Sequence, residues 1–220
     1  MLLNIENILS IEECQAICAA IAEPGHWRDG KETAKGGARA VKSNQQADPS
    51  SLPVKGALSK IEAALQKNPV FDAAAQPDRF IRLTINQYGP GMAYGEHVDA
   101  PYIHGYRTDL SFTLFLNSPE EYGGGDLVID NAGHQDAIRG AAGSVVLYPS
   151  RSLHRVEPVQ SGTRLACVGW IKSRVRSPEN RALLFEMETA LADLRECGTP
   201  SPVYNRLLNI RNNLLRTFGD

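Results

Sequence analysis

Two residues that flank a single position could bind a transition metal together. His97 and Asp99 lie on either side of Val98 in a stretch with the composition of a β-strand. Residues i and i+2 of a strand point to the same face, so the imidazole and the carboxylate converge on one point. They would be two of the three ligands in the facial triad that holds non-haem Fe(II) in oxygenases. The pair alone is weak evidence, because a chain with five histidines often contains a His-x-Asp by chance.

His154 can supply the third ligand of such a triad. It follows the apolar segment 144–147 and the turn at Pro149, and Arg164 comes ten residues later at the start of RLACVGWI. A guanidinium is permanently charged and offers a planar fork for a carboxylate. Arg164 therefore suits the distal carboxylate of 2-oxoglutarate. The combination of these residues is far more specific than any one of them.

The overall composition excludes several other classes of protein. The chain has 220 residues, a formal net charge of −2 and 22% charged residues, so it lacks the basic footprint of a nucleic-acid binder. No stretch approaches 18 consecutive apolar residues, so no membrane partner is expected. The N-terminus has neither the basic start nor the apolar core of a signal peptide, and we expect a cytoplasmic protein.

The segment 79–172 is predicted to form a β-barrel core. Short runs of β-forming residues alternate there with turn sequences such as Gly89-Pro90-Gly91. About eight strands result, at 80–88, 93–98, 110–116, 126–129, 135–139, 144–147, 154–156 and 164–171. Short strands at such regular spacing are typical of a sandwich or barrel.

Helices are predicted on both sides of this core. Ser10 and Glu13 form a capping-box signature for the first helix, whose expected buried stripe is Ile11, Ile17, Cys18 and Ile21. A short strand is expected around 38–41. The predicted helices cover 10–21, 51–67, 178–196 and 202–217. The expected fold class is α+β, with an antiparallel double-sheet barrel, N-terminal supporting helices and a C-terminal helical hairpin.

Six stretches carry a resemblance to a known family over nearly the whole chain. They are KSNQQ (42–46), NQYGPGMAYGEHVD (86–99), RTDLSFTLFLN (107–117), YGGGDLVI (122–129), GSVVLYPSRSLHRVEPVQSGTRLACVGWI (143–171) and the tail from SRVRSPENRALLF (173–185). In these stretches the chain resembles the Fe(II)- and 2-oxoglutarate-dependent oxygenases related to prolyl 4-hydroxylase, and more narrowly the PKHD-type hydroxylases. The resemblance implies a double-stranded β-helix (jelly-roll, cupin-like), with iron at His97, Asp99 and His154.

The resemblance also implies the co-substrates and the reaction. Arg164 would bind 2-oxoglutarate, and Tyr88 stands where the larger family often has a tyrosine that hydrogen-bonds it. O2 would be the second co-substrate and L-ascorbate the auxiliary reductant. The implied dioxygenase hydroxylates an unactivated C–H and releases succinate and CO2. Related halogenases have Gly or Ala at the carboxylate position, so Asp99 favours hydroxylation.

The substrate is left open by the sequence. A prolyl or lysyl residue of a peptide, a free amino acid and another small molecule are all compatible with the resemblance. Asn44, Gln46, His104 and Arg107 are candidates for the substrate pocket. The alternatives are a solvated loop for the first three and a structural ion pair with Asp109 for Arg107.

Two further alternatives concern the whole chain. A cupin-like domain could hold a metal for binding or sensing without turnover, but such a domain has no need of the dicarboxylate anchor that Arg164 provides. We expect residues 1–174 to form the dioxygenase domain and residues 175–220 to form the hairpin. The hairpin either packs on that domain or serves as a homodimer interface.

Overall fold

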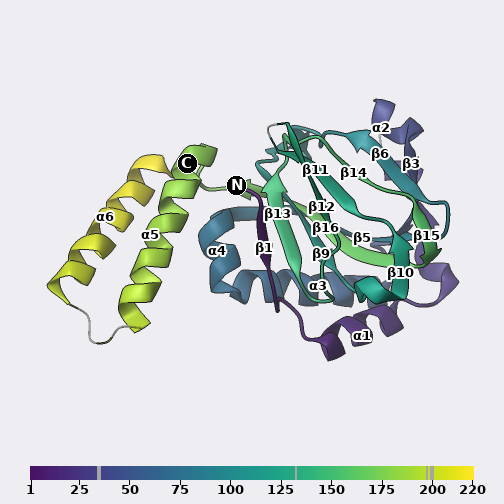
Figure 1. Cartoon of the computed structure of the whole chain (residues 1–220), viewed down its shortest axis with the longest axis horizontal. Coiled ribbons are helices and arrows are strands. Elements are labelled where there is room, and N and C mark those ends of the chain that lie inside the picture. The colour runs from purple at the N-terminus through teal and green to yellow at the C-terminus, as the bar shows by residue number, and fades with distance from the viewer. Residues whose placement is uncertain (34–35, 132, 197, 199–200) are drawn as a thin grey trace.

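A computed structural model of the chain describes residues 1–33, 36–131, 133–196, 198 and 201–220. Two β-sheets face each other, helices cover the outer side of one sheet, and a helical hairpin projects from one end of the molecule (Figure 1). Within the described residues, no helix combines the length and apolar character needed to cross a membrane.

The larger sheet has seven strands in the order β1-β13-β9-β16-β5-β4-β2. Its strands are Leu3–Ile5 (β1), Val145–Pro149 (β13), Leu110–Phe115 (β9), Arg164–Ser173 (β16), Pro77–Tyr88 (β5), Gln45–Ala47 (β4) and Trp27–Asp29 (β2). All neighbouring pairs are antiparallel. The longest pair, β5 with β16, runs from Tyr88 opposite Arg164 to Pro77 opposite Ser173.

The smaller sheet has five strands in the order β12-β11-β14-β6-β3. They are His134–Ile138 (β12), Leu127–Asn131 (β11), His154–Val156 (β14), Ala93–His97 (β6) and Lys42–Ser43 (β3). Two further short antiparallel pairs are present. They are the hairpin Tyr102–Ile103 (β7) with Tyr106–Arg107 (β8), and the long-range pair Tyr122–Gly124 (β10) with Val159–Gly162 (β15). This arrangement confirms the predicted α+β class and the eight predicted core strands, within three residues at their ends.

Successive side chains of β5 point alternately to the main core and to the space between the sheets. Ile85 is fully buried in the cluster that the sheet forms with the helices. Asn86 and Tyr88 line the cavity on the opposite side of the sheet. Residues i and i+1 of a strand point to opposite faces, so one strand supplies both the core and the cavity.

The N-terminal helices are Ile11–Ala20 (α1), Gly36–Ala40 (α2), Leu52–Lys67 (α3) and Pro69–Ala75 (α4). The capping box at Ser10 and Glu13 is confirmed. Ile11, which was predicted to be buried, is 61% exposed, and Cys14 takes that place in the stripe. The helix α3 buries residues three or four positions apart, namely Val54, Ala57, Ile61 and Leu65.

The segment between α1 and α3 differs from the prediction. A strand was expected around 38–41, but residues 36–40 form α2, and the strands β3 and β4 follow it. The sequence around Asn44 is too polar to indicate strands by itself. Its pairing comes from partners distant in the chain, because Lys42 lies opposite Tyr94 and Gln46 opposite Asn86.

The C-terminal hairpin consists of Pro178–Glu196 (α5) and Pro202–Phe218 (α6). Leu184 and Leu191 of α5 are buried, whereas α6 buries none of its residues completely. The end of the chain returns to the barrel, where the Asp220 amide donates to the Arg174 carbonyl at 2.8 Å. The predicted hairpin is therefore present. It is attached to the barrel mainly through α5 and through the last residues of the chain.

Candidate active site

Two adjacent strands of the smaller sheet bring the predicted metal ligands together. His97 ends β6, His154 begins β14, and the two residues are cross-strand partners with ring centroids 4.2 Å apart. Asp99 follows β6 directly, and its Oδ2 lies 3.8 Å from Nε2 of His154. One ligand atom from each of the three residues lies within 4.8 Å of the others. This spacing matches the three protein ligands of one small cation.

The hydrogen bonds of both histidines determine which nitrogen faces the site. Nδ1 of His97 lies 2.9 Å from the Gly95 carbonyl oxygen, and Nδ1 of His154 lies 3.0 Å from that of Ser152. A carbonyl oxygen only accepts, so each Nδ1 must carry the hydrogen and donate it. Each Nε2 therefore keeps a free lone pair, which is the arrangement usual in metal-binding histidines.

The electrostatic surroundings favour the ligating form of His97. Burial, followed by the neighbouring His154, lowers the pKa of His97 to about 4. The imidazole is thus neutral at neutral pH, as a metal ligand must be. Asp99 has a side chain only 8% exposed and is held by the Ser111 hydroxyl, which donates to its Oδ2 at 2.6 Å.

Arg164 lies buried in the wall of the same cavity. It is 1% exposed, and neither its Nε nor its Nη2 has a partner among the described residues. The guanidinium lies 5.5 Å from the Tyr88 ring and 5.4 Å from the Phe115 ring. A buried guanidinium without partners is costly, so this position fits an anionic ligand with a planar carboxylate.

The sharp turn at Gly125 allows Arg164 to take this position. Gly125 has a φ of +69°, and a Cβ there would lie 3.1 Å from Cδ of Arg164 and 2.9 Å from Cγ2 of Val159. Only glycine combines this backbone conformation with so close an approach.

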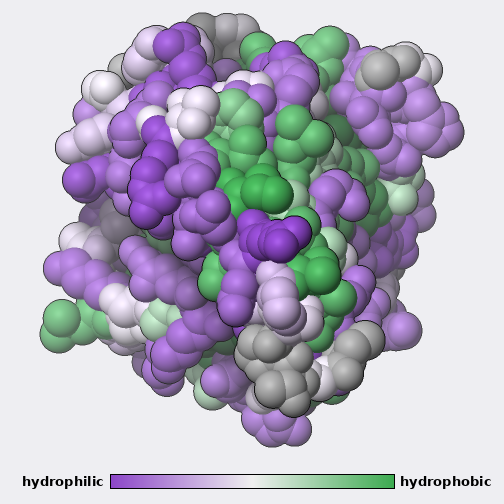
Figure 2. All heavy atoms as spheres, turned by 90° about the vertical axis from the view of Figure 1, so that its left-hand side faces the viewer, coloured by the Kyte–Doolittle hydropathy of each residue, from purple (hydrophilic) through white to green (hydrophobic). Residues whose placement is uncertain are grey.

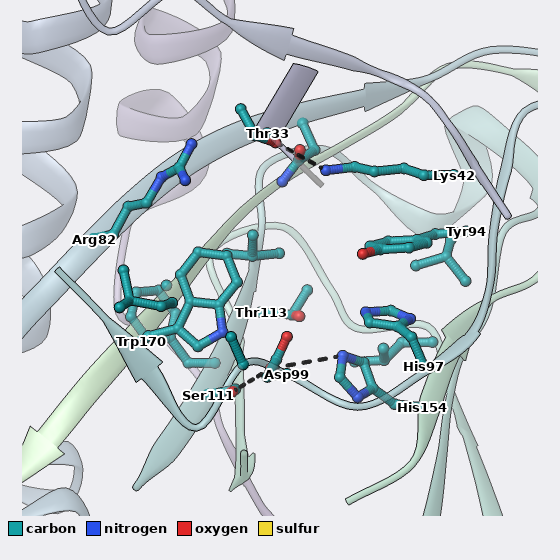
Figure 3. Close-up of a pocket in the computed structure, with 18 of the residues that line it drawn as sticks. Thr33, Lys42, Arg82, Tyr94, His97, Asp99, Ser111, Thr113, His154 and Trp170 are labelled. Carbon is teal, nitrogen blue, oxygen red and sulfur yellow. Dashed lines mark hydrogen bonds and ion pairs between the residues drawn. The ribbon is translucent and has the colours of Figure 1, made fainter. Parts of the chain in front are cut away.

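A cavity of about 470 Å³ connects the triad with Arg164. Figure 3 shows the triad at one end of this pocket, and Lys42, Thr33 and Arg82 at the other. The indole of Trp170 lies between the two ends. The volume suits a small co-substrate together with part of a second molecule.

The four predicted substrate residues separate into two pairs. Gln46 and His104 line the cavity. Asn44 is buried behind the wall, where its Nδ2 donates to Oδ1 of Asn86 at 3.1 Å. Arg107 does not line the cavity and instead pairs with Asp109, as the structural alternative predicted, and with Asp220.

Several residues of the cavity were missed by the sequence reasoning. Lys42, Arg82, Tyr94 and Trp170 all line it. A signal existed for Arg82, because it shares its strand face with Asn86 and Tyr88 at even spacing. Lys42 gave no comparable signal, since its strand is only two residues long.

Comparison with known proteins identifies the family. The family model described as the 2OG-Fe(II) oxygenase superfamily matches residues 83–172. A PKHD-type hydroxylase of Parvibaculum lavamentivorans is 43% identical over 220 residues, which is 100% of both chains. This chain belongs to the PKHD-type hydroxylases. Another member, from Synechococcus elongatus, is 41% identical over 224 residues and also covers 100% of both chains.

Solved structures show that the PKHD-type hydroxylase has the prolyl hydroxylase-like fold. A Pseudomonas putida prolyl-4-hydroxylase matches with a TM-score of 0.54 and 21% identity, over 79% of this chain and 92% of that one. A Trichoplax adhaerens prolyl hydroxylase, solved in complex with a hypoxia inducible factor peptide fragment, matches with a TM-score of 0.61 and 16% identity, over 83% and 86% of the chains. The predicted double-stranded β-helix is confirmed.

The family membership also settles the class of activity. The PKHD-type hydroxylase is an oxidoreductase that uses Fe(II) and 2-oxoglutarate, and it carries a candidate His-Asp-His triad. The expectation of an enzyme is thereby confirmed over that of a metal-binding domain without turnover.

Proposed function

We propose that this hydroxylase holds Fe(II) through Nε2 of His97, Nε2 of His154 and a carboxylate oxygen of Asp99, and binds 2-oxoglutarate through Arg164 and Tyr88. One observation carries the proposal: three ligand atoms within 4.8 Å of one another share a cavity with a buried guanidinium whose Nε and Nη2 have no partner among the described residues. The donor set fits iron, and the guanidinium fits the distal carboxylate of the co-substrate.

The bound iron and 2-oxoglutarate would supply the oxidative chemistry, in which O2, 2-oxoglutarate and a C–H group become succinate, CO2 and a C–OH group. The chain itself orients and shields these reactants. Ser111 holds the Asp99 carboxylate, and the Gly95 and Ser152 carbonyls fix the orientation of the two imidazoles. Such outer contacts keep the ligands in the geometry that the metal requires.

Tyr88 complements Arg164 in the proposed co-substrate site. The two residues are cross-strand partners on β5 and β16. Burial raises the pKa of Tyr88 to about 12, so its hydroxyl keeps its proton at neutral pH. It can therefore donate a hydrogen bond to the carboxylate that the guanidinium binds. L-Ascorbate completes the proposed reaction as the auxiliary reductant.

The proposed substrate is a prolyl or lysyl residue of a peptide, an amino acid or another small molecule, with Gln46 and His104 at the pocket as candidate contacts. Support for a peptide comes from the Trichoplax adhaerens enzyme, which was solved with a peptide fragment. The β7–β8 pair beside the cavity also exposes Tyr102 and Tyr106, at 61% and 40%. Exposed tyrosines are typical of surfaces that bind chains.

We propose residues 1–174 as the catalytic domain and residues 175–220 as a hairpin that pairs with a second copy of this chain. Figure 2, which faces the hairpin end, shows apolar side chains gathered among polar ones. Leu183, Val203 and Ile210 are each between 46% and 59% exposed there. Sedimentation of the native protein and of an Ile210→Asp variant tests this pairing. A native monomer would contradict it.

The experiment for the proposed function is a mass-spectrometric assay with Fe(II), 2-oxoglutarate and ascorbate. We expect succinate to form, and a product one oxygen atom heavier to appear from a panel of peptides and amino acids. Iron-loaded protein that forms no succinate under any of these conditions would contradict the proposal.

A further inference from the structure

Two cationic side chains, Lys42 and Arg82, line the end of the pocket opposite the triad. Lys42 extends from β3 toward Thr33, and Arg82 extends from β5 toward the same region (Figure 3). Lys42 is only 5% exposed, and its Nζ makes one hydrogen bond, of 3.2 Å, to the Thr33 hydroxyl. Two strands from different sheets thus place positive charge at the same end of the cavity.

Asp29 and Asp99 act on the charge of Lys42 only from beyond ion-pair distance. Among the described residues, neither Lys42 nor Arg82 has an acidic partner within ion-pair distance. Burial lowers the pKa of Lys42 to about 8, and Arg82 is the next cause of that lowering. Lys42 is buried and Arg82 is half-buried, and two like charges near each other in such surroundings are costly unless a ligand pairs with them.

The proposed cofactors do not compensate these charges either. The charged residues that line the cavity, apart from histidines, are Lys42, Arg82, Arg164 and Asp99. The iron dication and the 2-oxoglutarate dianion cancel each other, and Asp99 offsets Arg164. The charges of Lys42 and Arg82 therefore remain after both cofactors have bound.

The wall between the two ends of the pocket combines apolar side chains with polar ones such as Tyr94 and Thr113. Trp170 lies there (Figure 3), and Val168 and Ile103 line the same cavity. The indole Nε1 of Trp170 is buried and has no partner among the described residues. A ligand that spans the pocket would thus meet cations at one end, a mixed wall that includes the free Trp170 donor in the middle, and the triad at the other end.

We infer that Lys42 and Arg82 form a carboxylate subsite that selects an acidic substrate, with its anionic group held away from the carbon that is hydroxylated. This inference rests on the proposed function of the same pocket. The carboxylate is either that of a free amino acid or other small acid, or the terminal or side-chain carboxylate of a peptide. A fork of cationic donors is the usual means of binding such a group.

Paired acid and amide probes test the inference by binding alone. The protein is loaded with redox-inert Mn(II) and 2-oxoglutarate, and calorimetry measures the affinities of N-acetyl-L-proline, N-acetyl-L-leucine and the primary amide of each. A short peptide with a free C-terminus, compared with its C-terminal amide, distinguishes the peptide source from the small-acid source. For each acid that binds, we expect an affinity about tenfold higher than that of its amide.

Variants test whether Lys42 and Arg82 cause the tighter binding of an acid than of its amide. Lys42→Met and Arg82→Met should each abolish most of the acid preference, whereas Lys42→Arg should retain it. Lys60→Met, on the exposed face of α3, is the matched control. Replacing a buried charge by methionine preserves volume and favours folding. The affinity for 2-oxoglutarate should stay unchanged in every variant.

The outcomes separate this inference from the proposed function. Native protein that binds Mn(II) and 2-oxoglutarate, but binds no acid more tightly than its amide at millimolar concentration, overturns the carboxylate subsite alone. The same holds if the acid preference survives in both methionine variants. Native protein that does not bind 2-oxoglutarate would instead overturn the proposed function.

Discussion

The hydroxyl of Ser111 donates a hydrogen bond of 2.6 Å to Oδ2 of Asp99. This oxygen is also the one that lies 3.8 Å from Nε2 of His154. Ser111 belongs to β9 in the larger sheet, and its hydroxyl lies 2.8 Å from that of Ser150. The larger sheet therefore positions a carboxylate whose two histidine partners both lie on the smaller sheet.

Removing the Ser111 hydroxyl should weaken iron binding. In Ser111→Ala, the Asp99 carboxylate loses the donor that orients it, and loss of such a contact typically lowers metal affinity 10–100-fold. Chelator competition under anaerobic conditions measures the affinity. Ser150→Ala is the control, because Ser150 contacts only Ser111 in this chain of hydroxyls, and its effect should be smaller. An unchanged affinity in Ser111→Ala would show that Ser111 does not position Asp99.

Replacing Arg164 should weaken 2-oxoglutarate binding and leave iron binding intact. Arg164→Met removes a charge-assisted pair worth roughly 1.5–3 kcal/mol, so the KM for 2-oxoglutarate should rise about 10–100-fold. Tyr88→Phe removes one neutral hydrogen bond and should raise it less. Succinate formation at varied 2-oxoglutarate measures both effects. A normal KM in Arg164→Met would place the co-substrate elsewhere in the pocket.

A methyl group at Gly125 should disturb Arg164 selectively. Gly125→Ala and Gly133→Ala both strain a left-handed backbone, but only at Gly125 does the added carbon approach Arg164. Each strained residue costs about 1–3 kcal/mol of stability. We expect the KM for 2-oxoglutarate to rise in Gly125→Ala and to stay normal in Gly133→Ala. Equal KM values in the two variants would mean that this turn does not position the guanidinium.

The ion pairs of Arg107 should contribute unequally to stability. Asp109 has a side chain 7% exposed, whereas Asp220 is 44% exposed. Arg107→Met leaves the Asp109 carboxylate without its partner, which should cost about 3 kcal/mol of unfolding free energy. Asp220→Ala removes only an exposed pair and should cost less than about 1 kcal/mol. Denaturant unfolding compares the variants, and equal losses would contradict this division of roles.

The sequence was sufficient to predict the fold and the site where a local pattern of residues indicates them. The i, i+2 spacing of His97 and Asp99 and the turn residues between short strands indicate the triad and the barrel without reference to distant partners. The hairpin helices were equally clear, because Pro178 and Pro202 stand at the first helical positions. The chemistry of the guanidinium suggested 2-oxoglutarate as the ligand of Arg164, and the resemblance to a family supported this pairing.

The parts of the fold and of the site that the sequence did not predict depend on contacts between distant segments. Strands β3 and β4 are polar and two or three residues long, so only their pairing with β6 and β5 makes them strands. That pairing places Lys42 opposite Tyr94 and near Arg82, which no local pattern could reveal. Arg107 illustrates the reverse case, since its partner Asp220 is 113 positions away.

The most direct test of the iron site is Fe(II)-dependent succinate formation by the native protein and by Asp99→Ala. Asp193→Ala, on the exposed side of α5, is the matched control. We expect succinate from the native protein and the control, and none above background from Asp99→Ala at the same Fe(II) concentration. Full iron-dependent turnover by Asp99→Ala would contradict the assignment of the triad.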